Sequence, residues 1–584
     1  MGEVEWGAGM QITRRGWLGA TAAGAAAIGA PAMAMAAPVR RAEIPTAKFQ
    51  ILSTGSIDYR PALEALAAYA QGELVAVGLP GMTLSVTDNA GFTAVLALGW
   101  ADLDARDPVK PDHLFQIGSI SKSFLALTVL SLADQGAIDI DAPIARYLPG
   151  APWPDAPITA AQIMSHTSGL PDGAAIFPRT PDGRLWTGFP AGSKFSYSNT
   201  GFDLLGAAVE HVTGTSHELA ILQHVRKPLG VSDIAGQITQ NDRPRFPKAY
   251  IPWDQTLAAE MPGAAMGEAK WDPEDTPAGC IAATSGMMAR YLRGAMAIAG
   301  GKGAPVLSDP MARRFVTPVI ASDADFGPGS KYALGVAIQP VDGAPCLHHT
   351  GGMVAFSSSF HADPAVGVAA FASVNARIGG YRPRQTTAYA IRLMRAARAK
   401  APLPAPPDPL GPWKMKDPTA LYGRYFGPDD EEITISAGAE FPQISGMEAT
   451  APIYLADGMI ATPHYAFARH GFDPARTDGA VTGLWWGETL FGRDTAASQP
   501  VAPDRLRALA GVYINRDPWA GYAVVFARGE TLVLEGGGPL VERGDWWSRE
   551  KDVGGVERFR FDGVLNGKAT RLNVSGADFI RLGG

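Results

Sequence analysis

Residues 115–124 read Phe-Gln-Ile-Gly-Ser-Ile-Ser-Lys-Ser-Phe, and a run of Leu, Phe and Val at helical spacing continues to residue 134. Because this run contains neither Gly nor Pro, it predicts a buried helix over 119–134 with Ser119 in its first turn. Ser119 and Lys122 are three residues apart, which places both side chains on one face of that helix. The N–H groups at a helix N-terminus also favour negative charge. The stretch therefore predicts a serine nucleophile with a lysine within hydrogen-bond reach.

Neither short motif is specific by itself. Ser-x-x-Lys recurs at Ser548 and Lys551, in a charged stretch that predicts a solvated loop, and Tyr-x-Asn occurs both at 197–199 and at 513–515. The order of three motifs carries more information. Ser119 and Lys122 come first, Tyr197 and Asn199 follow, and residues 349–352 read His-Thr-Gly-Gly before a predicted strand.

In this order the chain resembles the penicillin-recognising serine hydrolases, which include DD-carboxypeptidases, D-aminopeptidases, class C beta-lactamases and related esterases. Segments 163–171, 199–206 and 277–279 also look like family segments in their expected places, and the resemblance covers roughly residues 50–395. It implies an α/β serine beta-lactamase-like catalytic domain, in which an antiparallel sheet is flanked by helices and carries a helical subdomain.

The resemblance also implies roles for the motif residues. Ser119 would form an acyl-enzyme while Lys122 and Tyr197 relay its proton, and either of these two could be the formal base. Asn199 would bind the substrate amide and Lys122. The backbone N–H groups of Ser119 and Gly352 would form the oxyanion hole. The remaining substrate-binding residues implied by the third motif are His349, Thr350 and Gly351.

His349 departs from the Lys-Thr-Gly of most beta-lactamases. A histidine attracts a substrate carboxylate more weakly and in a pH-dependent way, which disfavours a dedicated beta-lactamase. We therefore expect a peptidase or amidase acting on small, D-residue-containing or modified peptides, similar to D-aminopeptidases, DD-peptidases or linear-microcystin peptidases. A carboxylesterase of the same fold is the alternative, ahead of a beta-lactamase or a non-catalytic acylated receptor. His166 could instead serve a Ser-His-Asp triad, but the sequence has no Gly-x-Ser-x-Gly motif to accompany it.

Hydrophobic periodicity outlines the rest of the chain. It predicts a helix over 59–74, a hairpin of strands 82–87 and 92–98, and further strands over 332–341, 357–362 and 366–374. The catalytic domain is expected over 45–398, followed by a Pro-rich linker at 399–416. Residues 417–584 predict an all-β region, with small lipocalin-like barrels. The pattern Leu-x-Gly-x-Tyr occurs at 421–425 and again at 509–513, which indicates either two copies of a small barrel, as repeats 417–500 and 501–584, or two halves of one barrel.

The N-terminal sequence and the overall composition indicate where the protein is located and which partners and cofactors it can have. Arg14 and Arg15 precede an Ala/Gly-rich run, so residues 1–37 predict a twin-arginine signal and a periplasmic or secreted protein without a membrane span in the mature chain. A net charge of -7 without a dense basic run disfavours nucleic acid and favours a small peptide, amide or ester substrate. Two cysteines, Cys280 and Cys346, cannot form a disulfide framework, although they could pair. No metal-ligand spacing is present, so no cofactor is expected.

Overall fold

The computed structural model describes residue 44 and residues 47–178, 180, 182–231, 233–253, 261–301, 305–456, 459–462, 464–517, 519, 521–550 and 554–583. The expected export signal at 1–37 lies outside these residues. Within the described part, every helix is too short or too polar to cross a bilayer.

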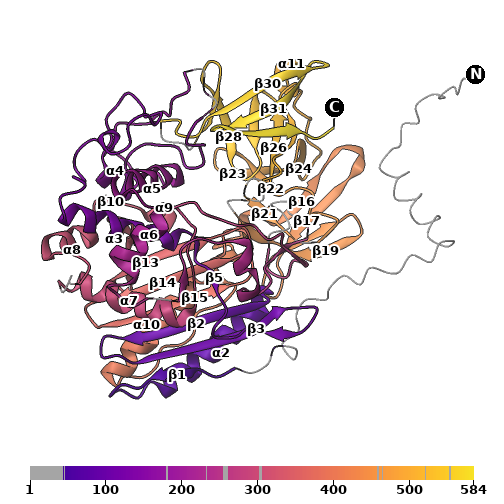
Figure 1. Ribbon diagram of the computed structural model, residues 1–584. Coiled ribbons are helices and arrows are strands. Elements are labelled where there is room, and N and C mark those ends of the chain that lie inside the picture. Colours follow the sequence, from indigo (N-terminus) through magenta and orange to yellow (C-terminus); the bar gives the residue numbers. More distant parts are fainter. Residues whose placement is uncertain are drawn as a thin grey trace, which may run out of the picture. The chain divides into compact units, whose positions relative to one another are not determined.

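An antiparallel sheet of ten strands forms the centre of the N-terminal two thirds of the chain (Figure 1). Its strand order is β1-β3-β2-β15-β14-β13-β12-β11-β10, and β4 pairs with β3. The strands are β1 (Gln50–Ser53), β2 (Gly81–Asp88), β3 (Thr93–Asp102), β4 (Asp107–Pro108), β10 (Ile320–Ala321), β11 (Lys331–Tyr332), β12 (Ala337–Val341), β13 (Ala344–Gly352), β14 (Ser357–Asp363) and β15 (Val368–Val374). Met82 of β2 lies opposite Val374 of β15, so the predicted N-terminal hairpin joins strands from far along the chain.

Helices cover both faces of this sheet because its central strands are apolar on both sides. Along β15, Val368 and Ala370 pack with α2 (Arg60–Val77) and α10 (Arg384–Ala399), whereas Ala369 and Phe371 pack with α3 (Ser121–Asp134) and α7 (Ser285–Ala299). Strands buried on both faces have continuous apolar runs rather than alternating ones. The other helices are α4 (Ala160–Met164), α5 (Asn199–Thr213), α6 (His217–Ile221), α8 (Asp309–Val316) and α9 (Asp323–Phe326). Short strands β5 (Phe115–Gln116), β6 (Ile234–Ala235), β7 (Tyr250–Pro252), β8 (Met266–Glu268) and β9 (Ala282–Ala283) lie between them.

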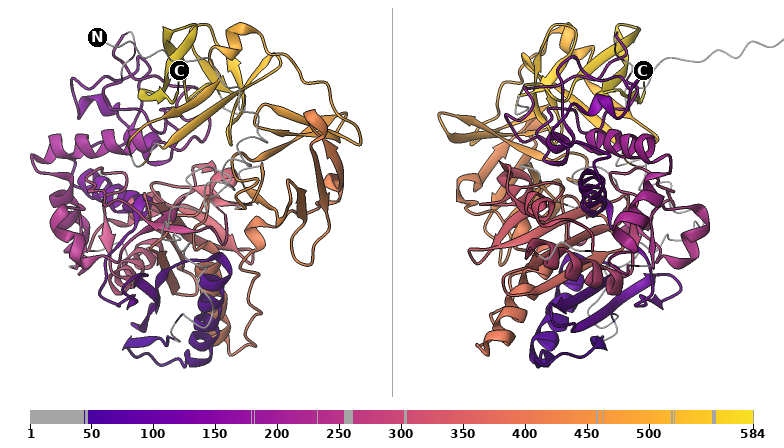
Figure 2. Two further views of the ribbon diagram at one scale, coloured as in Figure 1. Left: turned by 90° about the vertical axis from the view of Figure 1, so that its right-hand side faces the viewer. Right: turned by 60° about the vertical axis from the view of Figure 1, so that its left-hand side comes forward.

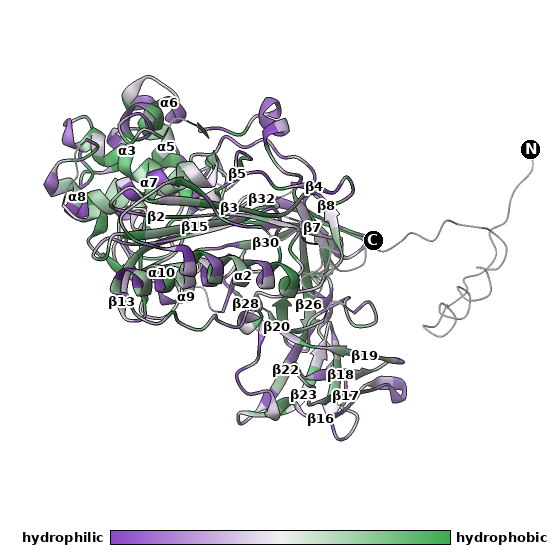
Figure 3. Cartoon of the chain, turned by 90° about the horizontal axis from the view of Figure 1, so that it is seen from below, coloured by the Kyte–Doolittle hydropathy of each residue, from purple (hydrophilic) through white to green (hydrophobic). Residues whose placement is uncertain are grey.

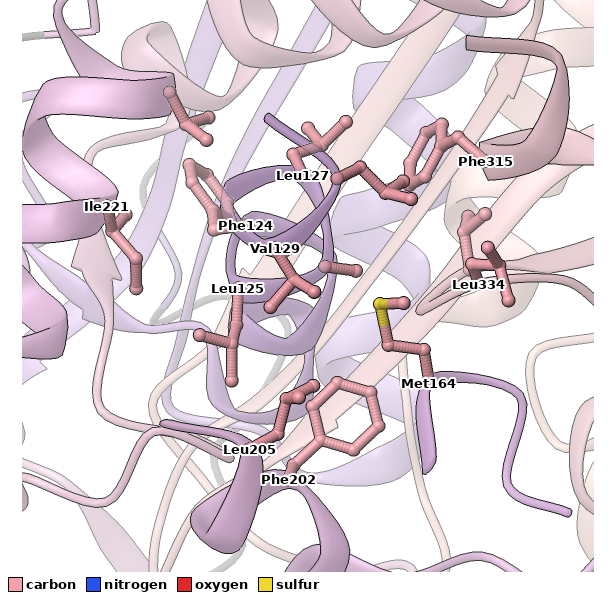
Figure 4. Packing of buried hydrophobic residues seen from close by; sticks show 14 of the residues in the cluster. Phe124, Leu125, Leu127, Val129, Met164, Phe202, Leu205, Ile221, Phe315 and Leu334 are labelled. Atoms are coloured by element: carbon pink, nitrogen blue, oxygen red, sulfur yellow. The ribbon is translucent and has the colours of Figure 1, made fainter. Parts of the chain in front are cut away.

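Helix α3 runs through the core, as its composition predicts. Its residues are mostly hydrophobic (Figure 3), and they pack in one cluster with side chains from α5, α6 and α8, where Phe315 of α8 lies beside Leu127 (Figure 4). The α-helix begins at Ser121 rather than at Ser119. Ser119 lies in a 3₁₀ turn, Gly118–Ile120, which precedes the helix. Gly118 has a φ of 55°, a left-handed conformation that cannot continue a helix backwards.

One detail of the predicted strands differs in the structure. The expected strand over 332–341 is broken into β11 and β12, because Gly335 adopts a φ of 78° and approaches α3, where an added Cβ would lie 2.5 Å from the Cβ of Ala126. The His-Thr-Gly-Gly motif precedes strand β14, as expected, and it also forms the end of another strand, β13. Cys280 and Cys346 are both buried and free, so they do not pair.

The described residues of the C-terminal region form strands, short helical turns and the four-residue α11 (Asp504–Arg507), and the strands lie in two separate groups (Figure 2). The first is a nine-stranded sheet and the second a closed eight-stranded barrel. The sheet contains β16 (Gly423–Phe426), β17 (Glu432–Ser436), β18 (Gln443–Gly446), β19 (Ala449–Pro452), β20 (Tyr454–Ala456), β21 (Met459–Ala461), β22 (Phe472–Thr477), β23 (Ala480–Trp486) and β24 (Thr489–Arg493). The barrel contains β25 (Gly511–Ile514), β26 (Tyr522–Arg528), β27 (Thr531–Leu534), β28 (Gly538–Glu542), β29 (Trp547–Arg549), β30 (Phe559–Leu565), β31 (Lys568–Val574) and β32 (Ala577–Arg581).

The repeated Leu-x-Gly-x-Tyr motif adopts the same local structure in both groups of strands. Tyr425 donates to the carbonyl of Leu421 at 2.7 Å, and Tyr513 donates to the carbonyl of Leu509 at 2.6 Å. Each tyrosine lies opposite an arginine of the last strand of its group, Arg493 or Arg581. The same local arrangement thus opens both groups. The exact repeat boundaries stay a prediction.

Candidate active site

Ser119, Lys122 and Asn199 come together in the structure. The ammonium nitrogen of Lys122 lies 3.0 Å from Ser119 Oγ and 2.5 Å from Asn199 Oδ1. Lys122 is fully buried, because α3 carries it in its first turn beneath the 3₁₀ turn that holds Ser119. Asn199 is the first residue of α5, whose N-terminus is capped by the Ser198 hydroxyl, an acceptor for Gly201 N–H at 2.9 Å. Two helix starts therefore meet at the serine.

Tyr197 lies beside this group. The Lys122 nitrogen is 5.0 Å from the centre of the Tyr197 ring. Burial raises the pKa of the Tyr197 phenol, and a hydrogen bond with Ser119 acts in the opposite direction. The phenol is therefore neutral near pH 7, and it can act as a proton donor or as a relay.

The charge of Lys122 is balanced by two half-buried aspartates. Burial lowers the pKa of Lys122 to about 8, while Asp203 and Asp172 act to raise it. Burial also raises the pKa of Asp203 to about 6. Ala278 links this carboxylate to the lysine, since its N–H donates to Asp203 at 3.1 Å and its carbonyl accepts from Lys122 at 2.9 Å. A lysine with a pKa near 8 can exchange protons close to neutral pH.

The glycines of the third motif bring β13 against the serine. A Cβ added at Gly351 would lie 1.8 Å from the carbonyl oxygen of Ile117, and one at Gly118 would lie 2.7 Å from the carbonyl oxygen of Gly352. These approaches are possible only without side chains. They bring the backbone of Gly352 next to that of Gly118, the neighbour of Ser119. An oxyanion hole formed by the N–H groups of Ser119 and Gly352 stays a prediction. Thr350 is half-buried beside them.

His349 is buried, and both of its ring nitrogens are hydrogen-bonded within the protein. Nδ1 donates to the carbonyl of Thr350 at 2.6 Å, which leaves Nε2 to accept from the hydroxyl of Tyr332 at 2.8 Å. Burial lowers the pKa of His349 to about 3, so the ring is neutral at pH 7. Attraction of a substrate carboxylate by His349 stays a prediction. In this arrangement the ring supplies no positive charge for it.

His166 supports the loop beneath Tyr197. Its Nδ1 accepts from the backbone N–H of Ser198 at 3.1 Å, and its ring stacks obliquely 4.1 Å from that of Tyr197. Burial lowers the pKa of His166 well below its usual value. The structure gives His166 contacts with backbone and aromatic rings rather than a hydrogen bond to Ser119.

Sequence reasoning missed several neighbours of the site. Asp172 accepts from both the backbone N–H and the side-chain amide of Asn199, at 3.0 and 2.8 Å. The guanidinium of Arg382 covers Gly352, where an added Cβ would lie 2.1 Å from its Nη2. Asp203 is a further neighbour that sequence reasoning missed. Its position could have been predicted from the sequence, because it follows Asn199 by four residues and so lies on the same helix face. The sequence contains no such signal for Asp172 or Arg382.

The second copies of the short motifs lie elsewhere. Tyr513 is in the core of the C-terminal barrel, and Lys551 is outside the described residues. Among the residues that the structure describes, no group of three or more His, Cys, Asp or Glu side chains is arranged to hold a metal ion.

The beta-lactamase family matches residues 66–393, more than half of the chain, and the protein belongs to this family. Curated relatives include penicillin-binding protein 4* of Bacillus subtilis (29% identical, over 24% of this chain and 34% of the relative). Esterase EstB of Burkholderia gladioli is 34% identical over 24% of this chain and 42% of the relative. The chain thus spans less than half the length of these two relatives. The octameric penicillin-binding protein homologue from Pyrococcus abyssi has the same fold, with a TM-score of 0.52 at 17% identity over 80% of this chain and 97% of that one.

Proposed function

We propose that this protein is an exported serine hydrolase that acts through an acyl-enzyme on Ser119 and cleaves amide or peptide bonds of small peptides, including those with D or modified residues. The observation that carries the proposal is the 3.0 Å contact between Ser119 Oγ and the buried Lys122 nitrogen. Family membership supports a hydrolase. Export by the twin-arginine route rests on the N-terminal sequence alone.

In the proposed reaction, Ser119 Oγ attacks the substrate carbonyl as its proton moves to neutral Lys122 or is relayed through Tyr197. The backbone N–H groups of Ser119 and Gly352 hold the oxyanion, while Asn199 and Thr350 bind the substrate amide beside Gly351. The C–N bond then breaks as the stored proton passes to the leaving amine. A water molecule, deprotonated by the same groups, hydrolyses the ester of Ser119 and restores the free hydroxyl.

An amide is favoured over an ester as the substrate, because the site holds a group that can protonate the leaving amine. An amine is expelled only after protonation, whereas an alcohol leaves more readily. Lys122, with its pKa lowered to about 8, is hydrogen-bonded to Ser119 and is suited to return that proton. Two relatives are named as penicillin-binding proteins, and the reactive bond of penicillin is an amide.

A carboxylesterase is the second candidate, because the relative named esterase EstB shares 34% identity with this chain. The experiment compares an anilide and an ester of the same D-amino acid, and their L counterparts, with Ser119→Ala as control. Amide cleavage that disappears in Ser119→Ala supports the proposal and shows the preferred hand. Cleavage of the ester alone makes the protein an esterase, and full activity in Ser119→Ala refutes both.

A further inference from the structure

The C-terminal barrel contacts the segment that leads to the candidate active site. Residues 554–558 precede β30 of the barrel, and Trp186 Nε1 donates to the carbonyl of Val556 at 2.7 Å. A Cβ added at Gly188 would lie 2.4 Å from Cγ2 of Val556, so the two segments meet closely. Arg558 stacks over the rings of Trp186 and Trp546, at 4.6 and 4.9 Å from their centres.

Glu557 lies at the centre of this contact. Its Oε1 accepts from the backbone N–H of Asp172 at 2.6 Å, and its Oε2 accepts from the hydroxyl of Ser575, a buried residue of the barrel. One carboxylate oxygen is therefore held by the barrel and the other holds the catalytic region. The carboxylate is a bridge between two parts of the chain that are 385 residues apart.

Asp172 connects the position of Glu557 to Asn199 and, through Lys122, to Ser119. Its carboxylate accepts from the backbone and side-chain N–H groups of Asn199, and its carbonyl accepts from the N–H of Thr200 at 3.0 Å. A side-chain amide that donates to Asp172 must point its oxygen the other way, toward Lys122, where the contact is 2.5 Å. The position of Asp172 thus determines which end of the Asn199 amide faces the lysine.

We propose that Glu557 is a positioning residue of the hydrolase, which fixes Asp172 and through it the orientation of the Asn199 amide against Lys122. This inference rests on the proposed function for its kinetic consequence only. The barrel thereby completes the acylation site without touching the reacting atoms.

The test compares Glu557→Ala with Glu557→Gln in the full chain. Gln keeps an oxygen that can accept from Asp172, whereas Ala removes the acceptor. Trp519→Phe is the matched control. Trp519 Nε1 donates to Glu274 at 3.2 Å, so this substitution removes a different hydrogen bond between the barrel and the catalytic region. The first measurement is hydrogen exchange at the amides of Asp172, Asn199 and Thr200, which needs no substrate.

Glu557→Ala is expected to speed exchange at these amides at least about tenfold, while Glu557→Gln and Trp519→Phe remain close to the wild type. With the D-amino acid anilide or ester that the wild type cleaves, kcat is expected to fall by about ten- to a hundredfold in Glu557→Ala with little change in KM, and to recover in Glu557→Gln. If Glu557→Ala does not fold, Glu557→Asp is used in its place, because it shortens the side chain but keeps its charge. The same changes in exchange rate and kcat are then expected, with smaller magnitudes.

Wild-type exchange in Glu557→Ala, or faster exchange with unchanged kcat, overturns the proposal. Equal losses in Glu557→Ala and Trp519→Phe also overturn it, because they show a general effect of barrel docking. If the wild type shows no hydrolysis that depends on Ser119 while exchange still rises in Glu557→Ala, the proposed function fails and the structural part of the inference stands.

Discussion

The buried ammonium of Lys122 is joined to the half-buried carboxylate of Asp203 through one residue, Ala278, whose carbonyl accepts from the lysine and whose N–H donates to the aspartate. The two charged groups thus form a pair without a direct hydrogen bond. Opposite charges in a water-poor site influence each other strongly. The protonation of Lys122 therefore depends on Asp203, which allows the role of the lysine to be tested separately from that of the serine.

Activity is expected to rise with pH through about 8. The base form of Lys122 is the neutral amine, its pKa is lowered to about 8, and so the reactive fraction grows as pH increases. The measurement is kcat/KM from pH 6 to 9.5 with a substrate that does not titrate in this range. A flat or falling profile would exclude Lys122 as the base.

Asp203→Asn is expected to move this rise to lower pH by roughly one unit, because the lost negative charge no longer stabilises the ammonium. Asn keeps an oxygen that can accept from Ala278 N–H, so the local structure should survive. The same pH series measures the midpoint. An unchanged midpoint in a folded variant would show that Asp203 does not tune the lysine.

Gly118→Ala is expected to lower kcat/KM by about a hundredfold. The new Cβ would lie 2.7 Å from the carbonyl oxygen of Gly352 and push β13 away from Ser119. Gly136→Ala is the control, since Gly136 also has a positive φ, of 74°, but open space around it. Both variants should lose about 1 kcal/mol of stability from backbone strain. Equal activity in the two would contradict the close approach as the cause.

Glu73→Gln is expected to stabilise the fold above pH 7. Glu73 is buried on α2, where it accepts from Thr386, and burial raises its pKa to about 7. The folded state keeps a proton that the unfolded state loses near pH 4.5, so stability falls as pH rises from about 4.5 to about 7. The variant should remove that fall, which over about 2.5 pH units amounts to roughly 3 kcal/mol at pH 8.

Urea unfolding at pH 5 and pH 8 measures this effect, with Glu64→Gln, an exposed residue of the same helix, as control. A wild type that is equally stable at both values would show that Glu73 stays ionised in the fold.

The sequence predicted the parts of the fold that depend on local pattern. Helix α2, the β2–β3 hairpin and β15 follow from apolar periodicity, and the spacing of Ser119 and Lys122 anticipated their contact. The break at Gly335 could not be predicted, because it depends on how closely that residue approaches α3. The same holds for Asp172 and Glu557, which meet only after the whole chain has folded.

The pairing of β2 with β15 also has a consequence for synthesis. When the ribosome has released the apolar hairpin β2–β3, the strand that covers the open edge of β2 has not yet been translated, and neither has α10, which packs with α2 on one face of the sheet. An uncovered apolar strand edge invites pairing with other chains. The emerging hairpin therefore keeps an unpaired apolar edge until the last strand of the sheet arrives.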